Sequence, residues 1–287
     1  MSAIPQDGQI NNWLKWSATE LSLTLEENTQ EAEWLLSSLL NCSKSELYIQ
    51  KNELSPPQCE LLQDWISRRI KGEPAQYIAG WTEFYGHRFN LNSSVLTPRP
   101  ETERLVDVAI HSLQEFDKPH VVDIGTGSGC IAISMAAELP SASILGLDIS
   151  AGALTIAEEN AVLNKITNIQ FLHTDFLRFT PDKPLYDCLL MNPPYIPLNE
   201  METLMINVRD YEPNLALTDQ KDGLTFYRRL AKMAKKWVYS GGWLIMEVGL
   251  GEHPNDASTC FDMNQFSNKE FIADFNGDNR ILKVKVV

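Results

Sequence analysis

The chain has 287 residues, enough to bury a sizeable core in one large domain or two small ones without disulfides or metals. Apolar residues make up 44% and charged residues 22%, an ordinary globular composition that excludes collagen-like, mucin-like and wholly disordered chains. The net charge is −14, whereas a protein that holds a nucleic-acid duplex mainly by its phosphates is normally basic.

Targeting and metal signals are missing from the sequence. The N-terminus has no basic segment followed by an apolar run, and no stretch approaches the ~18 apolar residues needed to cross a bilayer. The five cysteines are scattered without a C-x-x-C pair, and the five histidines have no metal-ligand spacing. We therefore expect a cytoplasmic protein with no membrane segment and no structural metal.

Residues 1–80 are predicted to form a small helical bundle. Apolar residues recur at helical spacing from Ile10 and again from Ala32, and Ser55 before Pro56 is typical of a helix start. The character then changes, and residues 81–100 read as a linker that contains a β-hairpin.

From residue 101 to 287, apolar strands alternate with helical stripes, which indicates an α/β domain with a parallel sheet covered by helices. The expected helices are Cys130–Leu139, Ala151–Leu163 and Leu224–Val238. The expected strands are His120–Ile124, Ser143–Leu147, Ile169–His173, Cys188–Met191 and Trp243–Val248, with a closing antiparallel pair at Phe271–Phe275 and Arg280–Val287.

A glycine-rich loop joins the first of these strands to its helix. Ligands in open α/β sheets bind beyond the carboxyl ends of the strands, and glycines let the backbone approach a ligand closely. The pattern G-x-G-x-G has neither the spacing of dinucleotide folds nor the lysine of a phosphate-binding loop, and so favours S-adenosylmethionine over NAD or ATP. The loop residues are Gly125, Thr126, Gly127, Ser128 and Gly129.

Acidic residues end the next two strands. Asp148 could accept hydrogen bonds from both ribose hydroxyls of an adenosine, although the same carboxylate could simply cap a helix. Asp175 and Phe176 could hold an adenine by its amino group and its face. Together with the glycine loop, this order of residues predicts a nucleoside cofactor.

The fourth strand ends in Asn192, Pro193, Pro194 and Tyr195, a tetrapeptide that is also a common turn. A planar amide or aromatic amine is a poor nucleophile because its nitrogen lone pair is delocalised. The Asn192 side-chain oxygen and the Pro193 backbone oxygen could each accept one N–H of such a group. The prolines stiffen the loop, and Tyr195 could pack on the planar group and favour a sulfonium charge. We therefore predict that these four residues are catalytic and bind the substrate.

The sequence resembles the HemK/PrmC family over nearly its whole length. These S-adenosylmethionine-dependent enzymes methylate the glutamine of the Gly-Gly-Gln motif in class 1 peptide-chain release factors, giving N5-methylglutamine and S-adenosylhomocysteine. The most family-specific segment is Pro98-Arg99-Pro100-Glu101-Thr102-Glu103. Further shared segments are Glu73–Ile78, Phe84–Gly86, the glycine loop, Asn192–Tyr195, Tyr211–Pro213 and Asp222–Leu224.

The resemblance implies a Rossmann-like S-adenosylmethionine-dependent methyltransferase fold, with a seven-stranded mostly parallel sheet whose last pair is antiparallel, preceded by the helical bundle. It also implies that residues 1–80 bind the release factor, that residues 101–287 are catalytic, and that the protein is a monomer. The implied cofactor-binding residues are Gly125, Thr126, Gly127, Ser128, Gly129, Asp148, Phe176 and Asn192.

Some features are not assigned by the resemblance. Arg99 and Glu101 could position the loop or the substrate, or form a purely structural ion pair. The stretches 218–221 and 250–260 depart from the family pattern.

Two other functions are compatible with parts of this sequence. A DNA or RNA adenine-N6 methyltransferase would use the Asn-Pro-Pro-Tyr segment equally well, but it must flip a base and usually carries a basic recognition region. The acidic net charge disfavours it, so we expect no direct nucleic-acid recognition. A non-enzymatic cofactor-binding protein is disfavoured by the intact tetrapeptide. One basic stripe is interpreted mainly as a solvated helix face; it consists of Arg228, Arg229, Lys232, Lys235 and Lys236.

Overall fold

The computed structural model describes residues 3–26, 28–49, 53–181 and 185–287. Two compact units make up the chain. The first contains Met1–Trp81 and Met205–Tyr211, and the second contains Thr82–Leu204 and Glu212–Val287. Among the described residues, no helix combines the length and the apolarity that crossing a bilayer requires.

The first unit is helical, as the apolar spacing predicted. Its N-terminal helices are α1 (Ile10–Leu21), α2 (Asn28–Leu40), α3 (Lys44–Ile49), α4 (Pro56–Ile70) and α5 (Ala75–Ala79). The predicted start of α4 is confirmed, because Pro56 is its first residue and Ser55 forms a capping box with Gln58. Trp13, Leu35 and Leu62 are among the large side chains buried in the core of this unit.

The short helix α9 (Ile206–Arg209) also belongs to this first unit, although no sequence pattern indicated it. Gly72 has a φ of +101°, and a Cβ there would lie 2.8 Å from the Ile206 side chain. The Tyr211 hydroxyl donates to the Lys71 carbonyl oxygen at 3.2 Å. A segment between two parts of the second unit is thus tied to the turn that follows α4.

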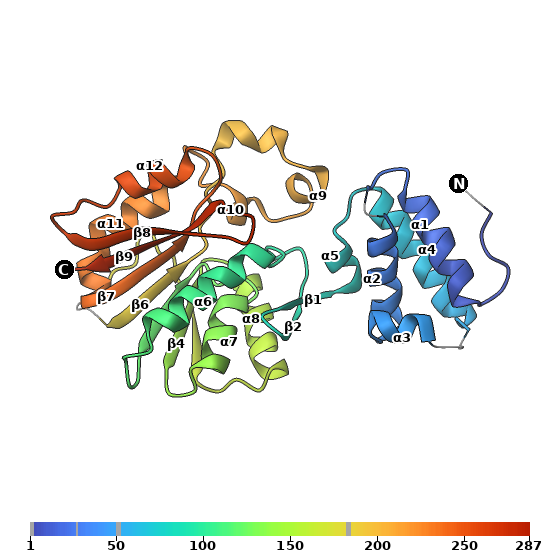
Figure 1. The fold of residues 1–287 in the computed structure, drawn as a ribbon, viewed down its shortest axis with the longest axis horizontal. Coiled ribbons are helices and arrows are strands. Elements are labelled where there is room, and N and C mark those ends of the chain that lie inside the picture. The colour runs from blue at the N-terminus through green and yellow to red at the C-terminus, as the bar shows by residue number, and fades with distance from the viewer. Residues whose placement is uncertain (1–2, 27, 50–52, 182–184) are drawn as a thin grey trace. The chain divides into compact units, whose positions relative to one another are not determined.

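The second unit has the predicted seven-stranded α/β sheet, in the order β5-β4-β3-β6-β7-β9-β8. Figure 1 shows β6, β7, β9 and β8 of this sheet side by side. The first five strands of this order are parallel, whereas β9 is antiparallel to both β7 and β8. The strands are β3 (His120–Ile124), β4 (Ser143–Asp148), β5 (Ile169–His173), β6 (Tyr186–Met191), β7 (Val238–Glu247), β8 (Phe266–Ala273) and β9 (Asn279–Val286).

Several predicted strand boundaries were wrong. Strands β6 and β8 begin at Tyr186 and Phe266 rather than at Cys188 and Phe271. Strand β7 begins at Val238 rather than Trp243, since it pairs with Tyr186 across an irregularity in β6. Strand β8 ends at Ala273 rather than Phe275, because the Asp274 carboxylate accepts hydrogen bonds from the next turn's N–H groups and ends the ladder there.

Helices cover both faces of the sheet, and the alternation of side chains along each strand shows which helices face which side. Val121 belongs to the hydrophobic cluster that contains residues of α6 (Glu103–Ser112) and α7 (Cys130–Glu138). Its neighbour Val122 belongs to the cluster with residues of α11 (Thr225–Trp237) and α12 (His253–Thr259). The remaining helices of this unit are α8 (Ala151–Leu163), α10 (Asn214–Leu217), η1 (Pro100–Thr102) and η2 (Leu198–Thr203).

The predicted hairpin is present as β1 (Trp81–Phe84) and β2 (His87–Asn90). The buried Asn160 of α8 exchanges two hydrogen bonds with the backbone of Asn90, at 2.7 and 3.1 Å. It also donates to the Ser128 carbonyl oxygen at 2.9 Å, so one side chain fastens both the hairpin and the glycine loop to α8.

Candidate active site

The register of the sheet brings three predicted segments to one edge. Ile124 at the end of β3 pairs with Leu147 of β4 and with Met191 of β6. The glycine loop and Asn192 follow β3 and β6, and Asp148 is the last residue of β4. They meet at the carboxyl edge, where open α/β sheets bind ligands.

The glycine loop is anchored to the end of β4. The N–H groups of Gly125 and Thr126 donate to the Leu147 carbonyl oxygen at 2.8 and 2.9 Å. Gly125 has a φ of +72°, and an added Cβ would have no atom within 4 Å, so conformation rather than crowding requires glycine there. Gly129 is crowded instead, because a Cβ would lie 2.9 Å from the Ile133 side chain. Gly125 thus leaves space open, while Gly129 permits close packing.

A cavity of about 350 Å³ lies against this loop. That volume is within the range of small-molecule sites. Among the described residues, Gly129, Pro193 and Tyr195 do not line it, although the sequence placed them in the site. The predicted residues that line it are Gly125, Thr126, Gly127, Ser128, Asp148, Asp175, Phe176, Asn192 and Pro194.

Asp148 lines the cavity and also organises the loops around it. One carboxylate oxygen accepts from the Gly127 N–H at 2.9 Å, and the other accepts from the Ser150 N–H at 2.8 Å. Burial raises the pKa of Asp148, and these backbone donors oppose the rise. A carboxylate has about four acceptor positions, so both oxygens keep capacity for ribose hydroxyls. The helix α8 is capped by Ser150 instead, whose hydroxyl accepts from the Ala153 N–H.

Unpartnered polar groups show that the cavity suits a polar ligand. The side-chain hydroxyls of Thr126 and Ser128 are buried without a hydrogen-bond partner among the described residues. Asp123, at the end of β3, is fully buried, and burial raises its pKa to about 7. Buried polar groups without partners are costly, so a ligand that supplies partners is favoured. Asp123 does not line the cavity, and the polar residues that do line it fit a nucleoside cofactor.

Phe176 forms an aromatic part of the cavity wall. It is 5% exposed, stacks on Phe226 with ring centroids 6.2 Å apart, and meets Trp237 edge to face. The loop that carries it is held by Arg229, whose guanidinium donates to the Phe179 carbonyl oxygen at 2.9 Å. One cation of the predicted basic stripe therefore supports the cofactor pocket.

Asn192 lies where the cavity meets the end of β6. Its Nδ2 donates to Thr102 Oγ1 at 3.3 Å, and Thr102 Oγ1 donates to the Glu247 carboxylate at 2.6 Å. Glu247 is 2% exposed, and burial raises its pKa. The Tyr195 hydroxyl donates to the other Glu247 oxygen at 3.2 Å, and its ring packs against His253. A contact between Tyr195 and a substrate stays a prediction.

The loop of residues 218–225 forms the opposite side of the cavity, which Thr218, Asp219 and Gln220 line. The Asp219 carboxylate accepts from three backbone N–H groups in this loop at 2.8–3.0 Å, those of Lys221, Gly223 and Thr225. Burial alone would raise the pKa of Asp219, but the hydrogen bonds to its carboxylate together outweigh burial and hold the pKa below its usual value. The loop that departs from the family pattern is therefore ordered by one carboxylate.

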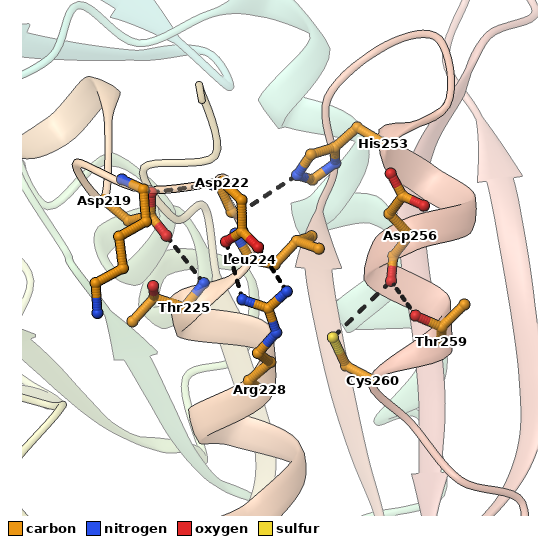
Figure 2. A network of polar contacts seen from close by, with 11 residues as sticks. Asp219, Asp222, Leu224, Thr225, Arg228, His253, Asp256, Thr259 and Cys260 are labelled. Carbon is orange, nitrogen blue, oxygen red and sulfur yellow. Dashed lines mark hydrogen bonds and ion pairs between the residues drawn. The ribbon is translucent and has the colours of Figure 1, made fainter. Parts of the chain in front are cut away.

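A second network links this loop to the stretch after β7 (Figure 2). Asp222 forms an ion pair with Arg228 at 2.6 Å. His253 Nδ1 accepts from the Gly249 N–H at 3.1 Å, which leaves the ring proton on Nε2, 3.5 Å from the Gly223 carbonyl oxygen. Burial lowers the pKa of His253 and favours this neutral form. Part of the unusual stretch 250–260 thus supports the cavity loop.

Arg99 lines the cavity and forms an ion pair with Glu212 at 2.6 Å. Glu212 is 5% exposed, and its partner is the arginine of the Pro-Arg-Pro segment. The structure thus connects two family segments that are more than a hundred residues apart.

Sequence reasoning missed Thr102, Asp219, Glu247 and His253 as parts of the site. Thr102 belongs to the family-specific segment, and Glu247 ends the fifth parallel strand, which are the only signals that could have found them. Asp219 and His253 lie in the two unusual stretches, where no pattern indicated a role. No group of residues suited to hold a metal ion occurs within the described ranges.

Comparisons with known proteins show what this chain is similar to. Two family models match, the PrmC N-terminal domain over residues 12–80 and the Methyltransferase small domain over residues 105–207. The release factor glutamine methyltransferase of Fusobacterium nucleatum is 37% identical over 89% of this chain and 72% of that protein. The protein of the same name from Geobacter sulfurreducens is 37% identical over 88% of each chain. A solved ribosomal protein L11 methylase from Lactobacillus delbrueckii is 21% identical, with a TM-score of 0.47 over 68% of this chain and 83% of that one.

Proposed function

The chain belongs to the release factor glutamine methyltransferase family, and we propose that it methylates the side-chain amide nitrogen, N5, of the glutamine in the Gly-Gly-Gln motif of class 1 release factors. The methyl donor is S-adenosylmethionine, and the products are N5-methylglutamine and S-adenosylhomocysteine. The observation that carries this proposal is the position of Asn192, at the wall of the cavity that the glycine loop, Asp148 and Phe176 also line.

The chain's residues divide the work between holding the cofactor and holding the amide. Asp148 would accept the ribose hydroxyls, and Phe176 would contact the adenine face. When bound, S-adenosylmethionine supplies a methyl group on a positively charged sulfur. The Asn192 Oδ1 and the Pro193 carbonyl oxygen would each accept an N–H of the glutamine amide and aim its nitrogen at that methyl. One N–C bond forms as the S–C bond breaks, and the nitrogen releases one proton. Positioning and preorganised dipoles provide the rate enhancement.

The helical first unit is proposed to bind the release factor at a surface away from its Gly-Gly-Gln loop. The match of residues 12–80 to the PrmC N-terminal domain, beside the match of residues 105–207 to a methyltransferase domain, supports this proposal.

An adenine-N6 methyltransferase remains the less favoured function. The chain carries a net charge of −14, and two cations of the basic stripe already have partners. Arg228 pairs with Asp222, and Arg229 is bound to backbone and hydroxyl oxygens near Phe179. Only part of the stripe is therefore free to contact phosphates.

Transfer of labelled methyl from S-adenosylmethionine to a purified release factor tests the function. We expect label on the wild-type factor and none when the glutamine of its Gly-Gly-Gln motif is replaced; label that persists on the replaced factor would refute the proposal. Asn192→Ala should lower kcat/KM about a hundredfold, since one preorganised polar contact is lost. Asn264→Ala, at an exposed asparagine bonded only to Asp262, is the matched control.

A further inference from the structure

A chain of hydrogen bonds runs from the buried end of β7 to Asn192. Glu247 accepts from Thr102 Oγ1 at 2.6 Å, and Thr102 Oγ1 accepts from Asn192 Nδ2 at 3.3 Å. Thr102 and Glu247 are each 2% exposed. Of the three side chains, only Thr102 and Asn192 line the cavity.

The number of protons decides the direction of this chain. A threonine hydroxyl has one proton, and Glu247 can only accept when its carboxylate is ionised. Burial raises the pKa of Glu247, but the charge of Arg280 and the donating hydroxyls of Thr102 and Tyr195 favour the ionised form. Because the Thr102 proton is committed to Glu247, Oγ1 can only accept from Asn192. The NH2 end of the Asn192 carboxamide must then face Thr102, and Oδ1 points away from Thr102. The two ends of a carboxamide have nearly the same size and shape, so packing alone would not choose between them.

We propose that Thr102 and Glu247 are positioning residues that orient the Asn192 carboxamide, so that an acceptor oxygen and not a donor NH2 meets the amide of the substrate glutamine. This inference rests on the proposed function, because a substrate NH2 needs acceptors. An inverted Asn192 would present its own NH2 to the substrate NH2, leaving buried donors without acceptors. Burying the Glu247 carboxylate costs free energy, and this role in substrate specificity accounts for its presence.

Glu247→Gln should reverse this orientation. In this variant the Tyr195 hydroxyl still donates to the side-chain oxygen of residue 247. The introduced NH2 group then faces Thr102, and every proton has an acceptor. Thr102 then accepts at one side and donates its proton to Asn192 Oδ1 at the other. Thr102→Val removes the relay altogether and leaves Asn192 with no preference, whereas Thr102→Ser retains the hydroxyl.

The kcat/KM for methyl transfer to the release factor distinguishes these cases, because it scales with the fraction of enzyme in the competent orientation. We expect Thr102→Val to lose about twofold in kcat/KM, since half of the molecules remain competent, and Thr102→Ser to keep a kcat/KM above that of Thr102→Val because it retains the hydroxyl. Glu247→Gln should lose about tenfold or more, since the hydrogen bond now favours the wrong orientation. The double variant Thr102→Val/Glu247→Gln should recover to about the level of Thr102→Val, because the reversed relay no longer exists.

Recovery in the double variant is the decisive result. A merely structural role for Glu247 predicts losses that add, so a double variant as impaired as Glu247→Gln, or more so, would overturn the inference. Wild-type activity in Glu247→Gln would overturn it as well. If the wild-type chain transfers no methyl to the glutamine, the proposed function fails and the inference fails with it.

Binding of S-adenosylhomocysteine and the melting temperature establish that each variant is folded. If Glu247→Gln does not fold, Thr102→Ser and Thr102→Val carry the test, since serine keeps the relay and valine removes it. Equal kcat/KM in those two variants would then overturn the inference, and a lower value in Thr102→Val alone would support it.

Discussion

Gly223→Ala should disrupt the active site without touching any side chain in it. Gly223 has a φ of +78°, and a Cβ there would lie 2.1 Å from the Tyr195 carbonyl oxygen. That oxygen belongs to the backbone of the predicted catalytic tetrapeptide, so rotating a side chain cannot relieve the overlap. One of the two backbone segments must move by about 1 Å to restore ordinary contact.

The expected loss of stability in Gly223→Ala is the sum of a conformational cost and a steric cost. The left-handed conformation alone costs an alanine about 1 kcal/mol, and the overlap adds about 1–3 kcal/mol. A total of about 3 kcal/mol corresponds to a fall in melting temperature of roughly 6–12 °C for a domain of this size. A displacement of about 1 Å in the tetrapeptide should lower kcat/KM about a hundredfold.

Gly277→Ala is the matched control. Gly277 has a φ of +91°, but a Cβ there would meet nothing within 4 Å. It should therefore lose about 1 kcal/mol of stability and keep wild-type activity. Thermal melting and steady-state methyl transfer measure both effects. Equal activity in the two variants would show that the contact between Gly223 and Tyr195 does not position the tetrapeptide.

Three further outcomes are expected. Asp148→Ala should weaken cofactor binding about thirtyfold or more in calorimetry, because both the Gly127 N–H and the ribose hydroxyls lose their acceptor. Asp262→Ala removes a similar hydrogen bond in a turn outside the site and should leave the affinity for the cofactor unchanged. The pKa of Asp123 in the folded protein is about 7. Between pH 4 and 7 the folded state therefore keeps a proton that the unfolded state releases, so the free energy of unfolding falls as the pH rises through this window. Asp123→Asn should therefore gain stability relative to wild type between pH 4 and 8, by at most about 4 kcal/mol, and a pH-independent difference in unfolding free energy would contradict this. Deleting residues 1–80 should weaken release-factor binding more than cofactor binding, and equal loss of both in a folded fragment would argue against the proposed role of the first unit.

The comparison of sequence and structure is most informative at the carboxyl edge of the sheet. Asp148 and Asn192 could be assigned to one site because each follows a predicted parallel strand, and parallel strands end at the same edge. Phe176, which follows β5 beyond the strand that carries Asp148, could be placed by the same reasoning. Tyr195 shows the limit of this reasoning, since its place in the tetrapeptide did not reveal that its hydroxyl is bound to Glu247.

The sequence by itself determined the α/β class, the glycine loop and the position of Asn192 beyond a strand, because these depend on local periodicity and on the order of elements. Only the tertiary structure decided which end of Asn192 faces the cavity. That choice depends on Thr102, which is 90 residues away from Asn192 along the chain, and on Glu247, which is 145 residues away from Thr102. The direction of a hydrogen bond is set by which donors and acceptors the fold brings into contact, and residue spacing carries no information about it.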